Sequence, residues 1–234
     1  MTDITGQIAL VTGANRGLGA EFVRQLLERG VEKVYAAVRR PDSLQAGDER
    51  IVPLELDVTD EESIVRAAED AGDVTLLINN AGIDRNQSLV TGDLGLARAE
   101  FDTNFWGPVL MTRAFAPIIE RNGGGGVISM HSALSWYAIG SYSVSKAALW
   151  SATNSARVEL APQGIHVVGV HVGWVDTDMA AGAAGPKETA DEVVGQALDA
   201  FESGRGEAVV GDVALRVKGA LSGPVEALYP QMRA

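Results

Sequence analysis

The sequence contains no cysteine, only three histidines, and 6% aromatic residues among its 234 positions. Without cysteine, neither a disulfide framework nor a thiolate metal site can form. His131, His166 and His171 lack the spacing of a metal-binding motif, and the last two flank an apolar strand-like stretch, which favours structural roles. The composition therefore predicts a fold without disulfides and without a metal site.

Basic residues are also scarce, since 19 Lys and Arg stand against 31 Asp and Glu, giving a formal net charge of -12. Nucleic-acid binding needs a positive field that neutralises phosphates, so we expect no nucleic-acid partner. No apolar run approaches membrane-spanning length, and the first residues show no basic stretch followed by an apolar one. We therefore expect a cytoplasmic protein that makes no membrane contact.

No proline-rich, serine-rich or charged run divides the chain, and one doubly wound sheet can absorb its length. Apolar strand-like runs recur between helical patterns, which indicates an α/β fold. We expect one domain over residues 1–234, with about seven parallel strands and helices on both faces of the sheet. The expected strands cover residues 8–11, 33–38, 51–56, 74–78, 127–130, 165–172 and 207–210.

Tyr142 and Lys146 lie four residues apart at the start of a stretch rich in helix formers. On a helix their side chains share one face. A lysine cation favours the phenolate and lowers the pKa of the phenol, which makes the pair a candidate acid and base. Tyr137 competes for the acid role but has no lysine four residues later. Taken alone, the Tyr142 and Lys146 spacing also occurs on solvated helices.

A glycine turn at residues 12–19 (TGANRGLG) lies between an apolar strand and a helical pattern over residues 20–29. Its glycines let the backbone turn tightly and approach a pyrophosphate, which would lie on the free amides of the helix N-terminus. The spacing Gly-x-x-x-Gly-x-Gly differs from the commoner Gly-x-Gly-x-x-Gly. A structural turn without a ligand is the alternative.

Together the two motifs resemble the signatures of the short-chain dehydrogenase/reductase family, Thr-Gly-x-x-x-Gly-x-Gly and Tyr-x-x-x-Lys. Further family segments follow in order at residues 79–82 (NNAG), 101–107 (FDTNFWG), 127–132 (VISMHS) and 172–177 (VGWVDT). The resemblance covers about residues 7–180 and implies a Rossmann-type fold, a nicotinamide cofactor and oxidoreductase activity. The catalytic residues it implies are Asn104, Ser132, Tyr142 and Lys146.

The resemblance also implies cofactor contacts from six segments of the chain. The implied cofactor-binding residues are Gly13, Asn15, Arg16, Gly17, Leu18, Gly19, Arg39, Asp57, Val58, Asn80, Ala81, Gly82, Tyr142, Lys146, Gly173, Val175 and Thr177. In the family, the aspartate at the position of Asp57 bonds the adenine, and the lysine at the position of Lys146 bonds the nicotinamide ribose.

The second expected strand ends at Arg39 and Arg40 and offers no carboxylate. In NAD-preferring enzymes an acidic residue near this point bonds the ribose hydroxyls, whereas an arginine can hold a 2′-phosphate. Arg16 occupies a position that is basic in NADP-preferring members of the family. We therefore expect a preference for NADP(H), with NAD(H) as a second cofactor. Solvated loop charges are the alternative for Arg39 and Arg40.

Asn104 lies within a long helical stretch, residues 96–120, that Pro108 and Pro117 should bend or break. In the family, the backbone carbonyl of this asparagine holds a water on a proton path from the lysine. A buried structural asparagine is the alternative.

The interval between Ser132 and Tyr142 is shorter than is usual in the family, which is the main departure from its pattern. Ser132 is the preferred hydroxyl because it directly follows the fifth expected strand. If the shortened loop moves this region, Ser129, Ser135 and Ser141 remain candidates.

Residues that border the nicotinamide in the resembled fold would line the substrate pocket, namely Ile83, Trp136, Tyr137, Ile139, Trp174 and Met179. This lining is apolar and partly aromatic, although both tryptophans have the core or a subunit contact as alternatives. No arginine or lysine in those segments precedes Lys187, so nothing there would neutralise an anionic substrate. We expect a neutral, hydrophobic ketone or aldehyde.

The resemblance thus implies an NADPH-dependent carbonyl reductase, in which Tyr142 donates a proton to the carbonyl oxygen and Ser132 donates a hydrogen bond. The family usually assembles as homodimers or homotetramers, and we expect the same here. A nonenzymatic NADP(H)-binding sensor or scaffold is one alternative, although such proteins usually lose the tyrosine or the lysine. A 3-oxoacyl-thioester reductase is another.

Overall fold

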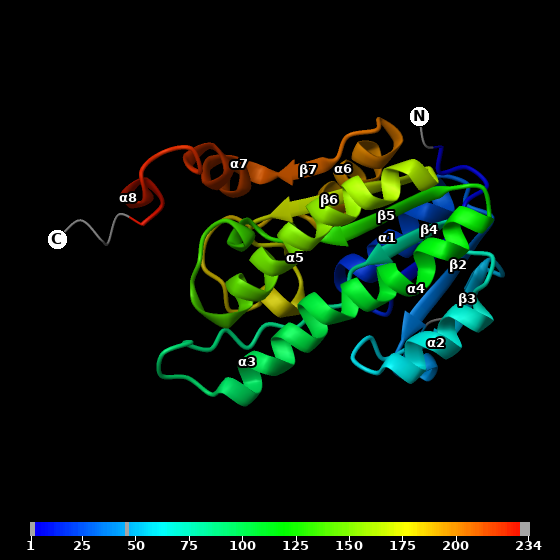
Figure 1. The fold of residues 1–234 in the computed structure, drawn as a ribbon, viewed down its shortest axis with the longest axis horizontal. Helices are drawn as coiled ribbons and strands as arrows, with labels where there is room; N and C mark the ends of the chain where they lie inside the picture. The colour runs from blue at the N-terminus through cyan, green and yellow to red at the C-terminus, as the bar shows by residue number, and fades with distance from the viewer. Residues whose placement is uncertain (1–2, 45–46, 230–234) are drawn as a thin grey trace.

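A seven-stranded parallel sheet, with strand order β3-β2-β1-β4-β5-β6-β7, forms the centre of the computed structural model, which describes residues 3–44 and 47–229 (Figure 1). This is the predicted Rossmann-type, doubly wound arrangement. The strands are β1 (Ile8–Thr12), β2 (Lys33–Val38), β3 (Ile51–Glu55), β4 (Leu76–Asn79), β5 (Gly125–Met130), β6 (Ile165–Val172) and β7 (Glu207–Val210). Each predicted strand is present, and the bounds differ from the prediction by at most two residues at each end.

The inner strands are apolar almost throughout because helices cover both faces of the sheet. Successive side chains point to opposite faces, so Ala9 and Val11 of β1 join the core on one side while Leu10 joins the core on the other. Phe22 and Phe201 fill the first core, and Phe115 is buried in the second.

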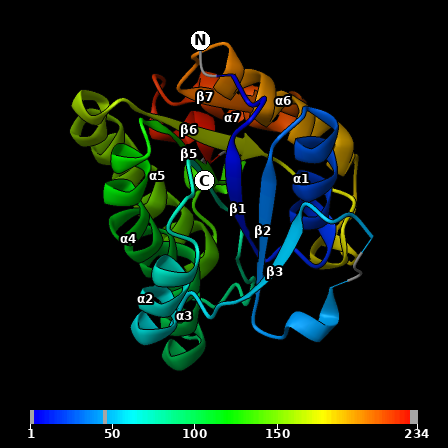
Figure 2. The same cartoon turned by 90° about the vertical axis from the view of Figure 1, so that its right-hand side faces the viewer.

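Two groups of helices sandwich the sheet, with α1 and α6 on one face and α2, α4 and α5 on the other (Figure 2). The helices are α1 (Gly17–Glu28), α2 (Glu61–Asp70), α3 (Leu94–Phe101), α4 (Gly107–Arg121), α5 (Gly140–Leu160), α6 (Ala190–Glu202), α7 (Gly211–Ala220) and α8 (Val225–Leu228). The chain between β2 and β3 contains a 3-10 turn at Pro41–Ser43 in its described part.

Helix α2 begins directly after Asp60, whose side chain caps it. The Glu62 amide donates to Asp60 Oδ1 at 3.0 Å. Thr59 instead donates from its amide and its hydroxyl to Asp57 Oδ1. The carboxylates of Glu61 and Glu62 in the first turn interact favourably with the positive end of the helix dipole.

The long helical stretch around Asn104 is interrupted, as its prolines predicted. A π-helical turn, Asp102–Trp106, separates α3 from α4, while Pro117 lies inside α4. In a regular α-helix the Asn104 carbonyl would accept from the amide of residue 108, but Pro108 has no N–H. The wider turn places Asn104 itself at a completely buried position.

Among the residues that the structure describes, no helix combines the length and the apolar character that a membrane span requires. Nor do their His, Asp and Glu side chains form a group of three or more that could hold a metal ion.

Candidate active site

The strands β1, β2, β4, β5 and β6 end at one cavity of about 1230 Å³. The strand order reverses between β1 and β4, so the helices after them cover opposite faces and leave a crevice at this edge of the sheet. Nearly all predicted site residues line the cavity. The exceptions are Gly19, Trp136 and Asn104.

The glycine turn at the start of α1 has the form that an anion site needs. Gly13 and Gly17 have φ angles of 66° and 53°, which side chains other than glycine rarely adopt. Helix α1 begins at Gly17, and no side chain caps its first amides. These amides and the positive end of the helix dipole fit the pyrophosphate of a dinucleotide.

Gly19 does not line the cavity. Its role is in the packing of α1 against the glycine turn. A Cβ atom on Gly19 would lie 2.0 Å from the Gly13 carbonyl oxygen and 2.7 Å from Asn80 Nδ2. Asn80 Nδ2 also donates to the Thr12 carbonyl oxygen at 2.9 Å, and the Asn80 amide donates to Thr12 Oγ1 at 3.0 Å. Gly19 therefore lets α1 pack closely against a turn that Asn80 ties to β4.

The segment after β6 forms the opposite wall from the glycine turn. A Cβ atom on Gly17 would lie 3.4 Å from Thr177 Cγ2, so the two segments nearly touch. Arg16 Nη1 lies 3.1 Å from Asp178 Oδ2, and both side chains are mostly exposed. Because exposed ion pairs contribute about 0–1 kcal/mol, Arg16 can leave Asp178 for a stronger phosphate contact.

Two arginines line the end of the cavity beside β2. Arg39 and Arg40 follow β2, line the cavity and are exposed. Neither side chain pairs with a carboxylate in the described part of the chain. Asp57 also lines the cavity, and its Oδ1 accepts two hydrogen bonds from Thr59. A dianionic phosphate would therefore find two uncommitted guanidinium groups at this end.

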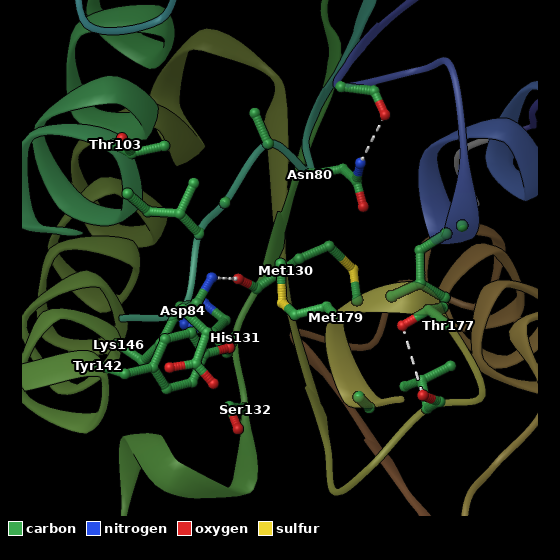
Figure 3. A pocket seen from close by; sticks show the side chains of 18 of the residues that line it. Asn80, Asp84, Thr103, Met130, His131, Ser132, Tyr142, Lys146, Thr177 and Met179 are labelled. Atoms are coloured by element: carbon green, nitrogen blue, oxygen red, sulfur yellow. Dashed lines mark hydrogen bonds between the residues drawn. The ribbon is translucent and has the colours of Figure 1, made fainter. Parts of the chain in front are cut away.

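Ser132, Tyr142 and Lys146 come together at the other end, where Figure 3 shows them below Met130. Ser132 follows β5 and lines the same part of the cavity as Tyr142, while Tyr142 and Lys146 lie one turn apart on α5. The spacing thus places both side chains at the cavity wall, as predicted.

The predicted lowering of the Tyr142 pKa is wrong in this structure. Burial and the Asp84 carboxylate raise the pKa of Tyr142, and the hydrogen bond with Ser132 only partly opposes them. Lys146 Nζ lies 5.8 Å from the centre of the Tyr142 ring and donates to the Met130 carbonyl oxygen at 2.8 Å. Lys146 is therefore directed toward β5 and does not contact the phenol oxygen.

Burial also acts on Lys146, whose side chain is 4% exposed. It lowers the pKa of Lys146 to about 8, because the apolar surroundings disfavour the ammonium form. A lysine with this pKa holds and releases a proton close to neutral pH.

Asn104 lies behind the cavity wall and positions it. Its Oδ1 accepts from the Ile83 amide at 2.9 Å, and its Nδ2 donates to the Ile83 carbonyl oxygen at 2.8 Å. Nδ2 also donates to Ser145 Oγ at 3.2 Å. The side chain thus has the structural role that the sequence left as an alternative, and the proline at position 108 keeps its carbonyl from its usual helical bond.

The cavity distinguishes Ser132 from the other candidate serines. Ser129 is buried within β5, Ser135 accepts from the Ser132 amide at 3.3 Å, and Ser141 donates to the buried carboxylate of Glu100. Of these four serines, Ser132 alone lines the cavity in the described chain. The geometry therefore supports Ser132 as the hydroxyl that faces a substrate.

The prediction that Trp136 lines the substrate pocket is wrong. Trp136 is 6% exposed and stacks on His171, with 3.9 Å between ring centres, while Trp150 meets it edge-on. Its indole is part of the core, the alternative that the sequence left open. The other five predicted lining residues, Ile83, Tyr137, Ile139, Trp174 and Met179, do line the cavity.

Residues 7–187 of the chain match the short chain dehydrogenase family. The chain belongs to this family. A short-chain dehydrogenase from Burkholderia cenocepacia J2315, solved in complex with NADP, is 42% identical, with a TM-score of 0.94 and 99% of each chain covered. The NADPH-bound carbonyl reductase from chicken fatty liver is 31% identical, with a TM-score of 0.74, over 84% of this chain and 91% of that one.

A curated relative, the short-chain dehydrogenase srdE of Neurospora crassa, is 32% identical over 181 residues. The match covers 74% of this chain but only 62% of the fungal protein. Family membership makes this short-chain dehydrogenase an NAD(P)-dependent oxidoreductase.

Several cavity residues of this short-chain dehydrogenase escaped the sequence analysis. Asp84 and Arg85 follow Ile83, His131 precedes Ser132, and Arg216 lies on α7. Asp84 follows the predicted lining residue Ile83, and His131 lies within a recognised motif, so the sequence offered a signal for these two. No local pattern pointed to α7. Arg85 and Arg216 correct the expectation that nothing beside the substrate would neutralise an anion, because both line the cavity with exposed side chains.

Proposed function

We propose that this short-chain dehydrogenase uses NADPH to reduce a neutral, hydrophobic ketone or aldehyde to an alcohol, and that the reaction is reversible. The observation that carries the proposal is the continuity of one cavity from the glycine turn and Arg39 to Ser132, Tyr142 and Lys146. The NADP and NADPH complexes of the two solved relatives support the cofactor, and the chicken carbonyl reductase supports the reaction class.

The chemistry divides between the cofactor and two side chains, Tyr142 and Ser132. When bound, the nicotinamide supplies a hydride to the carbonyl carbon. Tyr142 donates its phenolic proton to the carbonyl oxygen, which completes the alcohol, while Ser132 donates a hydrogen bond to that oxygen as negative charge develops. The raised pKa of Tyr142 keeps the phenol protonated, which suits the acid role in reduction.

Lys146 and Asn104 maintain the part of the site beside Tyr142. Lys146 is buried one helical turn from Tyr142, and its pKa of about 8 lets it bind and release a proton close to neutral pH. Asn104 joins Ile83 in the cavity wall to Ser145 on α5. These contacts keep the wall beside Tyr142 in place while substrates enter and leave.

Oxidation of NADPH in the presence of aldehydes, ketones and 3-oxoacyl thioesters tests the reaction class. We expect turnover of neutral aryl and alkyl ketones. Preferred turnover of the thioesters would favour a 3-oxoacyl-thioester reductase instead. NADPH binding without turnover of any compound would favour the sensor or scaffold function.

NADPH should bind at least about tenfold more tightly than NADH, because the 2′-phosphate can form charge-assisted hydrogen bonds with arginine. Arg39→Asp should narrow or reverse this difference, since it removes a cation and adds a carboxylate near the ribose hydroxyls. Titration of both cofactors by fluorescence measures the two affinities. Equal affinities in the unmodified protein would contradict the proposal.

Arg113→Asp is the matched control for this experiment. It changes the net charge by the same amount on an exposed part of α4 that does not line the cavity. If Arg113→Asp narrowed the difference as much as Arg39→Asp, the preference would come from the overall field and not from a contact at Arg39.

Acetophenone-like ketones should have a higher kcat/KM than keto acids of similar size. Ile83, Leu134, Ile139 and Val213 give the cavity a largely apolar wall, and Asp84 repels a carboxylate there. Initial rates over a concentration series for each pair of compounds provide the comparison. Clear preference for the keto acids would show instead that Arg85 or Arg216 binds the substrate anion.

A further inference from the structure

Asp84 places a carboxylate in the substrate end of the cavity, beside the proposed proton donor. Asp84 lines the cavity, and Figure 3 shows it on the same side as Tyr142 and Lys146. Burial raises the pKa of the Tyr142 phenol, and the charge of Asp84 raises it further. A substrate whose carbonyl oxygen meets Tyr142 therefore has its neighbouring atoms close to this carboxylate.

The backbone on both sides of Asp84 is held by buried side chains. Asn104 makes two hydrogen bonds to Ile83, which precedes Asp84. Glu100, which is completely buried, accepts from the amides of Arg85 and Asn86, which follow it. The backbone that carries Asp84 is thus held before a substrate binds, which lowers the entropy cost of using its carboxylate.

The carboxylate of Asp84 has no hydrogen-bond or ion-pair partner among residues 3–44 and 47–229. The nearby Lys146 donates to the Met130 carbonyl oxygen instead. Burial, together with the charge of Glu100, raises the pKa of Asp84. A partly desolvated acceptor without a partner gains most from a donor that arrives with the substrate.

The surroundings of Asp84 favour a neutral donor over a charged one. Tyr142 and Lys146 on α5, Glu100 on α3, Asp102 on the π-helical turn, His131 after β5 and the adjacent Arg85 are the titratable or charged groups around it. An anion would meet the Asp84 and Asp102 carboxylates, and an ammonium ion would lose its hydration between Lys146, Arg85 and an apolar wall. A hydroxyl group avoids both costs.

We propose that Asp84 determines specificity by accepting a hydrogen bond from a hydroxyl group next to the substrate carbonyl, so that the preferred substrates are hydroxyketones. This inference rests on the proposed function, whose neutral ketones it narrows. The acceptor on Asp84 and the donor on Tyr142 bind the two oxygens of such a substrate from one side of the cavity.

The test compares 2-hydroxyacetophenone with acetophenone, which differ by this hydroxyl group. The unmodified enzyme should show at least about a tenfold higher kcat/KM for the hydroxyketone, mainly through a lower KM, as expected for a hydrogen bond to a charged acceptor. Asp84→Leu should remove the difference, and Asp84→Asn, which keeps an acceptor without the charge, should reduce it. Asp102→Asn, which removes another cavity carboxylate, should leave the ratio of the two substrates unchanged.

A pH profile provides a second readout that a merely structural role would not change. Asp84 raises the pKa of Tyr142, so Asp84→Asn should lower it. Alcohol oxidation needs the Tyr142 phenolate as base, and the rise in oxidation rate with pH should therefore move to lower pH in this variant. An unchanged profile would contradict the placement of Asp84 next to the reacting oxygen.

Other outcomes separate this inference from the proposed function. Equal kcat/KM for both ketones would overturn the role of Asp84 but not the proposed carbonyl reduction. The same holds if the ratio of the two kcat/KM values is unchanged in Asp84→Leu. A higher kcat/KM for 2-amino-1-phenylethanone, which carries an ammonium group next to its carbonyl, than for the hydroxyketone would also overturn it. Asp84 would then select a cation. If neither ketone is reduced, calorimetric binding of the two ketones to the unmodified protein and to Asp84→Leu decides the question without turnover.

Discussion

Tyr142→Phe lowers turnover by about 10³-fold in our expectation, because it removes the proton donor and leaves the carbonyl oxygen without its acid in the transition state. NADPH affinity should stay within a few fold, since the phenol oxygen acts on the substrate carbonyl in the reacting complex. Steady-state rates of NADPH oxidation and a fluorescence titration of NADPH measure the two effects separately. A variant that keeps normal turnover would rule out Tyr142 as the acid, and the nearby Tyr137 would be the next candidate.

Serine variants test the second proposed donor in the same assay. Ser132→Ala should also lower kcat, but less than Tyr142→Phe, because a hydrogen bond is lost and no proton donor. Ser129→Ala serves as the control, since Ser129 is buried within β5 and does not line the cavity. Normal activity in Ser132→Ala together with an inactive Ser129→Ala would reverse the assignment.

Gly19→Ala should have the second large effect, a loss of NADPH affinity of about 100-fold together with a lower melting temperature. The added Cβ would lie 2.0 Å from the Gly13 carbonyl oxygen, which belongs to the turn and cannot rotate away. Helix α1 would have to move away from β1, and its first amides would then be displaced from the pyrophosphate. Calorimetric titration of NADPH and thermal unfolding measure the two losses.

Gly219→Ala is the matched control for the glycine substitution. Gly219 lies in α7, and a Cβ atom there would have no heavy atom within 4 Å. Alanine favours a helix by about 1 kcal/mol over glycine, so this variant should keep its NADPH affinity and its melting temperature should not fall. If Gly19→Ala behaved like Gly219→Ala, the close packing of α1 on the turn would not be needed for the cofactor site.

The sequence by itself determined the fold class and much of the cofactor site, because these depend on local patterns. An apolar run followed by closely spaced glycines specifies a strand, a tight turn and a helix start through backbone sterics alone. The spacing of Tyr142 and Lys146 places both on one face of α5 for any regular helix. Pro108 and Pro117 likewise predicted an irregular helix around Asn104. A proline lacks the N–H that would bond the carbonyl four residues before it, so its effect can be located from the sequence.

Only the tertiary structure decided which side chains meet across the cavity and how their protons are held. Trp136 packs in the core against His171, and Arg216 reaches the cavity from α7, a contact between segments far apart in the chain. The pKa of Tyr142 rises although Lys146 is its helical neighbour, because burial and Asp84 outweigh a lysine that bonds to Met130. Burial and through-space charge depend on where every other element packs, and no spacing within one helix contains that information.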